Sequence, residues 1–219
     1  MPVDDADRLG PKGHVYVELV REQWRAPLER GSARRALLTS FLGAALIIFG
    51  TIFALEVYGE SILLIGIGLF AFVSSLGEIR ALLPEFSEAR RIGWVEATLD
   101  DNSVTIGEPA ILRVVLHARR KLTLRGATAL AEARHWDRAT AGAVVSSISL
   151  PISVAGESVA RGDDWRHALT FRIPETAPTS VYTSNDSTRW TLTLELTFAE
   201  DGPWRRTWPM LVFPADDVS

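Results

Sequence analysis

The sequence has no cysteine among its 219 residues. A disulfide framework and a thiolate metal site are therefore excluded, and cysteine usage gives no information on the redox compartment. The four histidines belong to no zinc-protease pattern, and serine-hydrolase, P-loop and dinucleotide-binding motifs are absent. A net charge of −4 provides no overall basic field for nucleic acid. These absences predict a protein that is not an enzyme and has no catalytic residue, cofactor, metal or nucleic-acid partner.

One short cluster is an alternative to that prediction. His135-Trp136-Asp137 places an imidazole and a carboxylate close together at the end of a predicted strand. Such a pair could bind a metal or act as a base. The preferred interpretation is a turn histidine whose hydrogen bonds are satisfied by its neighbours.

Two long apolar runs occupy residues 36–57 and 61–77. An α-helix rises about 1.5 Å per residue, so about 20 apolar residues cross a hydrocarbon core of about 30 Å. The first run has this length, and the second reaches it with Glu78 and Arg80 at the interface. Both runs lack the polar stripe of a soluble core helix, and the first begins too late for a cleaved signal peptide. We predict a transmembrane helical hairpin over residues 36–83.

The distribution of arginine predicts the orientation of this hairpin. Arginines precede the first run and follow the second, whereas the connection at residues 56–61 has two glutamates and no basic residue. The positive-inside rule then places both termini in the cytoplasm, with two spans in the inner (plasma) membrane. Neither run contains His, Met, Asp or Lys, the residues that ligate pigments or line ion paths. The hairpin is therefore predicted to be an anchor.

Small residues recur at helical spacing in both runs. Because lipid gives helices no hydrophobic reason to associate, close backbone approach matters for their packing. The residues expected to provide it are Ser40, Ala44, Gly50 and Ala54 in the first run and Gly66, Ala71 and Ser75 in the second. We expect them to close the hairpin on itself, and the alternative is a face that receives a helix from another protein.

Residues 1–35 form a predicted cytoplasmic leader with two interpretations. Residues 15–30 place Trp24 between arginines just before the first run, which favours a short interfacial helix on the membrane. The alternation of Val15, Val17 and Leu19 also permits an edge strand added to the C-terminal domain. Both interpretations remain open at this point.

Residues 92–214 consist of short segments in which apolar and polar residues alternate, separated by turns. The clearest segment is 190–198, where Trp190, Leu192, Leu194, Leu196 and Phe198 share one face. Similar segments occupy 94–99, 110–119, 127–135, 144–154, 165–173 and 204–213, and Pro151 favours an edge position or a bulge for its strand. This pattern predicts a cytoplasmic antiparallel β-sandwich of the immunoglobulin type, preceded by a linker at 84–91 and followed by a tail at 215–219.

The end of the chain carries a resemblance. The segments LTFRIPETAPTS (169–180), STRWTLTLEL (187–196) and WPMLVFP (208–214) are similar to the last three strands of bacterial membrane-associated proteins with an arrestin-like sandwich. The upstream segments GWVEATL and GEPAILRVVL fit the same pattern, whereas the 35-residue leader does not. The resemblance covers roughly the C-terminal half of the chain and implies a domain that binds other proteins.

Two sets of contact residues follow from these patterns. Interfaces favour Trp, Tyr and Arg, so the predicted partner contacts are Trp24, Tyr182 in a long loop at 174–188, Trp204 and Arg205. Clustered cations attract anionic headgroups, so the predicted headgroup contacts are Arg34, Arg35, Arg119, Arg120 and Lys121. The alternative for the cluster at 119–121 is a hairpin tip that is merely kept soluble.

The sequence therefore predicts a non-catalytic integral membrane protein. Its cytoplasmic sandwich is expected to bind other membrane protein subunits while the hairpin contacts the lipid bilayer. An accessory or structural subunit of an energy-transducing or transport complex fits this description. The alternative is a membrane-tethered sensor domain for a lipid or another small ligand.

Overall fold

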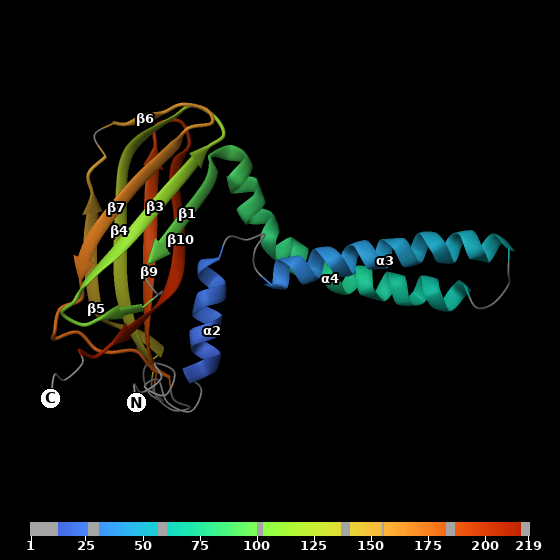
Figure 1. The fold of residues 1–219 in the computed structure, drawn as a ribbon, viewed down its shortest axis with the longest axis horizontal. Coiled ribbons are helices and arrows are strands. Elements are labelled where there is room, and N and C mark those ends of the chain that lie inside the picture. The colour runs from blue at the N-terminus through green and yellow to red at the C-terminus, as the bar shows by residue number, and fades with distance from the viewer. Residues whose placement is uncertain are drawn as a thin grey trace. The chain divides into compact units, whose positions relative to one another are not determined.

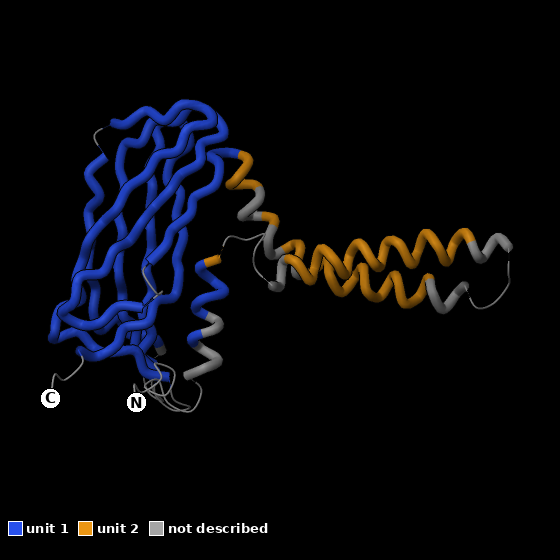
Figure 2. Tube along the Cα trace, in the orientation of Figure 1, with its two compact units in different colours: residues 1–24, 91–219 blue, residues 25–90 orange. Residues whose placement is uncertain are grey.

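The computed structural model describes residues 13–25, 31–56, 61–99, 103–136, 141–154, 156–182 and 187–215. The chain divides into two compact units, which Figure 2 colours separately. One unit comprises Arg25–Arg90, and the other comprises Met1–Trp24 together with Arg91–Ser219. The first is helical, and the second is built mainly of strands.

The helical unit contains α3 (Gly31–Glu56) and most of α4 (Ser61–Arg91), which pack against each other in antiparallel fashion. The hydroxyl of Ser40 is hydrogen-bonded to that of Ser75. Closer to the connection, a Cβ atom added to Gly43 would lie 2.7 Å from the carbonyl oxygen of Gly68. The two backbones therefore approach as closely as glycine allows.

The span prediction is supported for one helix. Within the described residues, Arg34–Ile52 of α3 is long and apolar enough to cross a membrane, and only 17% of its most apolar window is buried. The apolar part of α4, Ile65–Gly77, is shorter than a full span. A second span is therefore a prediction that the described residues do not establish.

Residues 84–91, where a linker was expected, are helical. α4 continues without interruption to Arg91 and includes Pro84. Glu85, Glu88 and Ala89 have high helix propensity, and extending an existing helix avoids the cost of nucleating a new one. The charged segment that follows the apolar run is therefore part of the helix and not a linker.

The second unit is a β-sandwich of two sheets (Figure 1). The smaller sheet has the order β1-β3-β7, formed by Gly93–Leu99, Pro109–Ala118 and Asp164–Arg172. The larger has the order β2-β10-β9-β4-β5, formed by Ser103–Thr105, Gly202–Phe213, Ser187–Phe198, Leu122–Trp136 and Ala141–Ile152. Two short strands join it, with β6 (Ser158–Val159) pairing with β4 and β8 (Val181–Tyr182) pairing with β9. Each longer strand coincides with a predicted segment, so the sandwich is confirmed.

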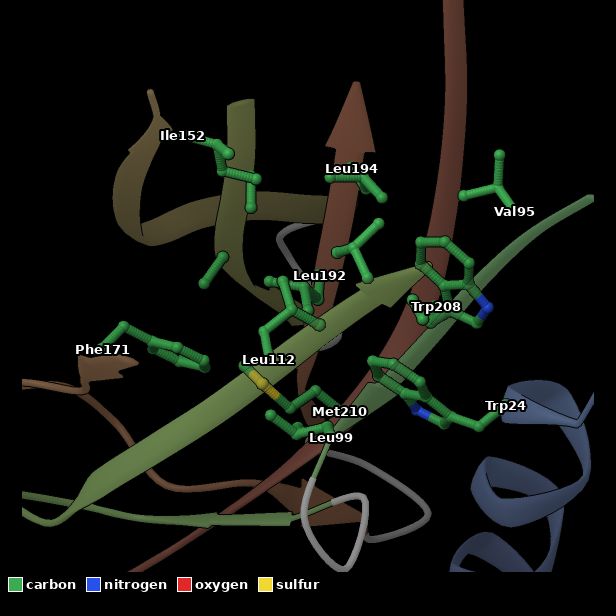
Figure 3. Packing of buried hydrophobic residues seen from close by; sticks show 14 of the residues in the cluster. Trp24, Val95, Leu99, Leu112, Ile152, Phe171, Leu192, Leu194, Trp208 and Met210 are labelled. Carbon is green, nitrogen blue, oxygen red and sulfur yellow. The ribbon is translucent and has the colours of Figure 1, made fainter. Parts of the chain in front are cut away.

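The core lies between the sheets and follows from the alternation along the strands. On β9, Trp190, Leu192 and Leu194 are completely buried between the sheets, while Thr191 and Thr193 lie on the opposite face of the strand, where Thr191 is half-buried and Thr193 is 8% exposed. Leu112 from β3 and Met210 from β10 belong to the same cluster (Figure 3). The three short strands β2, β6 and β8 were missed, because two or three residues are too few to show a period of two.

The leader contributes a helix, α2 (Gly13–Trp24), to this core. Val17, Val20 and Trp24 recur at helical spacing and pack against the sandwich cluster. The interpretation as an edge strand is therefore wrong. The interpretation as a helix is right, but its apolar face packs on protein.

Candidate interaction surfaces

α2 is held on β10 by one tryptophan pair. The indole ring of Trp24 stacks on that of Trp208 with centroids 5.5 Å apart, and its Nε1–H donates a hydrogen bond to the carbonyl of Pro209 at 2.7 Å. Figure 3 shows the two side chains side by side. The guanidinium of Arg206 lies 5.3 Å from the Trp208 ring centroid on the same strand. These contacts tie the leader to the last strand of the chain.

The structure places three of the four predicted partner contacts in the core. Trp24 is 9% exposed, and Tyr182 and Trp204 are each 4% exposed. Arg205 is exposed on the outer face of β10. Large aromatic side chains were expected at an interface with another protein, but this chain uses them to close its own sandwich. Among the four, only Arg205 offers its side chain to a partner.

The predicted loop at 174–188 is partly structured and is attached to the core. The Nε1–H of Trp190 donates to the carbonyl of Pro178 at 2.8 Å. The amide of Ser180 donates to the carbonyl of Val212 at 2.8 Å, and the amide of Val212 donates to the Ser180 hydroxyl at 2.9 Å. β8 then pairs with the beginning of β9, which corrects the expectation of an unpaired loop. Residues 183–186, at its tip, lie outside the described part of the chain.

The basic tip between β3 and β4 is exposed at all three predicted headgroup contacts, Arg119, Arg120 and Lys121. Arg120 forms an ion pair with Asp201. Nearby, the amide of Thr123 donates to the carboxylate of Glu200 at 3.0 Å, and this hydrogen bond lowers the pKa of Glu200. The tip therefore includes its own acidic groups, which reduce its positive field. Arg34 and Arg35, the other predicted headgroup contacts, are exposed on α3.

A charged cluster on the smaller sheet was not predicted. His117 Nδ1 lies 2.6 Å from Asp164 Oδ1, and its Nε2 lies 3.7 Å from Glu96 Oε1. Arg166 donates to the other oxygen of Asp164 at 2.9 Å. The hydrogen bonds from Arg166 and His117 lower the pKa of Asp164. The alternation of residues marks these positions as outward-facing, but only the strand register brings them together.

The described residues offer no metal centre. No group of three or more His, Cys, Asp or Glu side chains among them is arranged to hold a metal ion. His135 of the tempting His-Trp-Asp cluster has its Nδ1 3.1 Å from the Thr188 hydroxyl. That contact fits a histidine satisfied by its neighbour, whereas Asp137 lies outside the described residues.

The small residues of the hairpin have different environments. Ser40 and Ser75 meet, Gly50 is buried, and Ala44 and Ala71 are half-buried. Gly66 is exposed, with no atom within 4 Å of a Cβ added there, and the side chain of Ala54 lies outside the described part. The close backbone approach between Gly43 and Gly68 was not predicted. The two glycines belong to different runs, and only the pairing of the helices shows that they are opposite each other.

The outer surface of the hairpin is apolar. Its exposed large hydrophobic residues are Leu37, Leu38, Phe41, Leu42, Ile48, Phe49 and Ile52 on α3, and Ile67, Leu69, Phe70, Val73, Leu76 and Leu83 on α4. Soluble monomeric proteins rarely expose apolar patches as continuous as this one, and such patches mark contact with membrane or protein. In the described part of the sandwich unit, by contrast, the exposed large hydrophobic residues are Val144 and Val145 on β5.

Comparison with known proteins identifies no family. No family model and no curated protein sequence matches the chain. The structure is similar to the crystal structure of Spo0M, a sporulation control protein from Bacillus subtilis, with a TM-score of 0.43 and 14% sequence identity. The match covers 54% of this chain and 48% of the Spo0M chain, so it spans about half the length of each protein. At this level the likeness carries no argument about function, and the sandwich architecture rests on the strand pairing of the chain itself.

Proposed function

We propose that this chain is a non-catalytic integral membrane protein whose hairpin anchors a cytoplasmic β-sandwich that binds other proteins. The observation that carries the proposal is the apolar outer surface of α3 and α4. Phe41 and Phe70, for example, are each 76% exposed. Burying one such side chain in an apolar medium contributes about 2 kcal/mol, so a bilayer stabilises the hairpin in a way that water does not.

The lengths of the helices support the same placement. α3 has 26 residues and α4 has 31, which correspond to about 39 Å and about 46 Å. A hydrocarbon core is about 30 Å thick, so α3 is long and apolar enough to cross it, whereas α4 has the length but is apolar only over Ile65–Gly77. The polar C-terminal part of α4 would then lie outside the hydrocarbon core. Two spans with both termini in the cytoplasm are the arrangement that the arginines favour.

We infer the role of the sandwich from its attachment to the hairpin and from the motifs that the sequence lacks. It is tethered to a proposed membrane anchor, and the sequence carries no recognised catalytic motif. We therefore assign it to protein–protein interaction, as an accessory or structural subunit of a larger membrane complex engaged in energy transduction or transport. An arrestin-like ancestry and a bacterial origin belong to this proposal and rest on the sequence resemblance at residues 169–214.

Anchoring and orientation can be tested with cysteine labelling, because the natural chain has no cysteine. The full chain should remain in the membrane pellet after an alkaline carbonate wash. Single cysteines at Arg119 and Ser219 should react with an impermeant maleimide only from the cytoplasmic side, and one at Gly59 only from the outside. Extraction by carbonate would refute the anchor, and labelling of position 219 from outside would refute the orientation.

Assembly needs a separate measurement. Purification of the full chain from its native membrane in mild detergent should give a complex of fixed stoichiometry. Arg205→Glu should weaken that complex, because Arg205 is the exposed member of the predicted partner contacts. Arg172→Glu, at an exposed arginine on the other sheet, provides the matched control. A solitary protein in the native extract would contradict the proposed role as a subunit.

A lipid-binding sensor is the second candidate function, and the exposed cations Arg119 and Lys121 favour it. Each cation near an anionic surface contributes about 1 kcal/mol to binding. Under this alternative, Arg119→Glu/Lys121→Glu should reduce contact of the sandwich with phosphatidylserine vesicles, and added salt should do the same. Arg120→Glu should have a smaller effect, since Arg120 already pairs with Asp201. Equal binding by all variants would exclude the tip as a lipid site.

A further inference from the structure

β5 forms an open edge of the larger sheet and has unusual composition for such a position. The strand order ends at β5, which is hydrogen-bonded to β4 (Figure 1). Its 12 residues, AGAVVSSISLPI, include no charged side chain. Charged residues are a common device by which edge strands avoid pairing with other strands. The edge strand β7 of the smaller sheet carries Asp164, Arg166 and Arg172, and β2 has only three residues.

The same strand exposes apolar surface. Val144 and Val145 are 49% and 50% exposed, and they are the exposed large hydrophobic residues of the described sandwich unit. Pro151, near the other end of β5, is also exposed. A strand edge that combines exposed valines with an absence of charge is suited to a partner that is itself uncharged and extended.

The prolines of the sheet indicate which backbone groups of β5 face outward. Proline has no N–H, so a pair containing it cannot exchange both hydrogen bonds and fits a non-hydrogen-bonded position. Hydrogen-bonded and non-hydrogen-bonded positions alternate along each pair of strands. When the registers are followed from β10 through β9 and β4 to β5, Pro203 and Pro209 on β10 and Pro151 on β5 all fall at non-hydrogen-bonded positions. In that alternation, Ile148 and Leu150 bond to β4. The N–H and C=O groups of Ser147 and Ser149 therefore point away from the sheet.

We propose that β5 pairs antiparallel with β5 of a second copy of this chain, about a two-fold axis at Ile148. This register places Ser147 of each copy opposite Ser149 of the other copy. Each of these two pairs exchanges two backbone hydrogen bonds, which makes four in total. Moving the axis to Ser149 would place Ser147 opposite Pro151, which has no N–H to donate. Moving it to Ser147 would place Ser149 opposite Val145, which the irregularity in the β4–β5 register leaves without a partner on β4. The central register is the one that pairs Ser147 with Ser149, and it places the two unsuitable residues, Val145 and Pro151, opposite each other at the ends of the ladder.

The edge is complementary to itself in this arrangement. A symmetric interface places each patch against its own copy, so a central charge would meet a like charge. β5 has none, and the register brings Val145 next to Pro151 of the second copy at both ends. Pairing along the edge of a single strand buries a small area, so we expect a weak dimer in dilute solution. Confinement to one membrane raises the effective concentration of the chains, so we expect more dimer there than in dilute solution. This expectation rests on the proposed anchoring.

Cysteine cross-linking of the full chain in vesicles tests both the partner and the register. In the double variant Ser147→Cys/Ser149→Cys, the cysteine at position 147 lies opposite the cysteine at position 149 of the second copy. Their Cα atoms are about 5.5 Å apart, a separation that a disulfide can bridge. In either single variant the equivalent cysteines are diagonal, at about 7–8 Å. The double variant should therefore give at least tenfold more covalent dimer than each single one. A single variant that cross-links as well refutes the register.

The matched control is Ala168→Cys/Thr170→Cys, two exposed residues with the same spacing on the edge strand β7. It should give at least tenfold less dimer than the β5 pair, and equal yields would mean random collision and overturn the proposal. A covalent product with another protein in place of the second copy would also overturn it. Carbonate extraction of the same vesicles reports anchoring separately. A membrane-bound chain that fails to cross-link therefore refutes the pairing alone.

Charge substitution gives an independent test. Ser147→Lys/Ser149→Lys places lysines opposite each other, whereas Ser147→Lys/Ser149→Glu places each lysine opposite a glutamate of the second copy. Photobleaching of labelled chains in vesicles should show at least a tenfold lower dimer fraction for the first variant than for the second. Both positions are exposed, so each variant should keep the tryptophan fluorescence of the folded chain. Equal dimer fractions in the two folded variants would refute β5 self-pairing.

Discussion

Replacing Trp24 by alanine should release α2 from the sandwich. The substitution removes a buried indole, its stack on Trp208 at 5.5 Å and its 2.7 Å hydrogen bond to Pro209. A buried Trp→Ala change costs about 3–5 kcal/mol, of which the stack and the hydrogen bond each account for about 1 kcal/mol. We expect α2 to undock without unfolding the sheets, and we therefore take the lower end, about 3 kcal/mol, as the expected loss of docking free energy.

Hydrogen exchange of the full chain in detergent measures this loss. A change of about 3 kcal/mol corresponds to exchange about 100-fold faster in the amides of α2. Trp24→Phe keeps the ring stack but loses the Nε1–H donor, so it should accelerate exchange only about fivefold to tenfold. Arg21→Ala, at an exposed position on the same helix, should leave exchange unchanged. If Trp24→Ala changed α2 exchange by less than threefold, the tryptophan pair would not be what holds α2.

Three further predictions concern close approaches and charge. Gly43→Ile should separate the hairpin helices, because even a Cβ there lies 2.7 Å from the Gly68 carbonyl; disulfide formation in a Ser40→Cys/Ser75→Cys background should fall at least tenfold. Gly93→Ala should lower the free energy of unfolding by at least about 3 kcal/mol in urea titrations, since φ is +111° and the new Cβ would lie 1.9 Å from the His117 carbonyl. The pKa of Asp164 is lowered by Arg166 and His117, so its stabilising contribution is present above about pH 4 and is lost as the pH falls below that value. Asp164→Asn should therefore flatten the decrease of the urea midpoint below pH 4, and an unchanged slope would contradict this account.

Local pattern was sufficient wherever one residue period extended over many residues. The alternation of Trp190, Leu192 and Leu194 predicted a half-buried strand, and β9 is that strand. Pro151 predicted an edge or a bulge, and its strand is both an edge and irregular in register. These predictions succeeded because the period reports directly which face is buried.

The predictions of contact residues were less successful for a physical reason. Trp24, Tyr182 and Trp204 have the composition of an interface, but a side chain that can cover a partner can equally cover the chain's own core. The sequence shows that an aromatic side chain needs an apolar neighbour, but it does not show which neighbour. The His117–Asp164 pair was missed because its members are 47 residues apart and are joined only by the β3–β7 register.

The sequence by itself determined the two apolar runs, the alternating strands of the sandwich and the absence of a recognised catalytic motif. Each of these depends on residues that are near one another in the chain, where period and composition carry the physical information. Tertiary structure alone decided that α2 packs on β10, that Gly43 faces Gly68, and that β5 is the uncharged open edge. Those features depend on which distant segments share a core or a sheet, and that choice is made by the free energy of the whole chain.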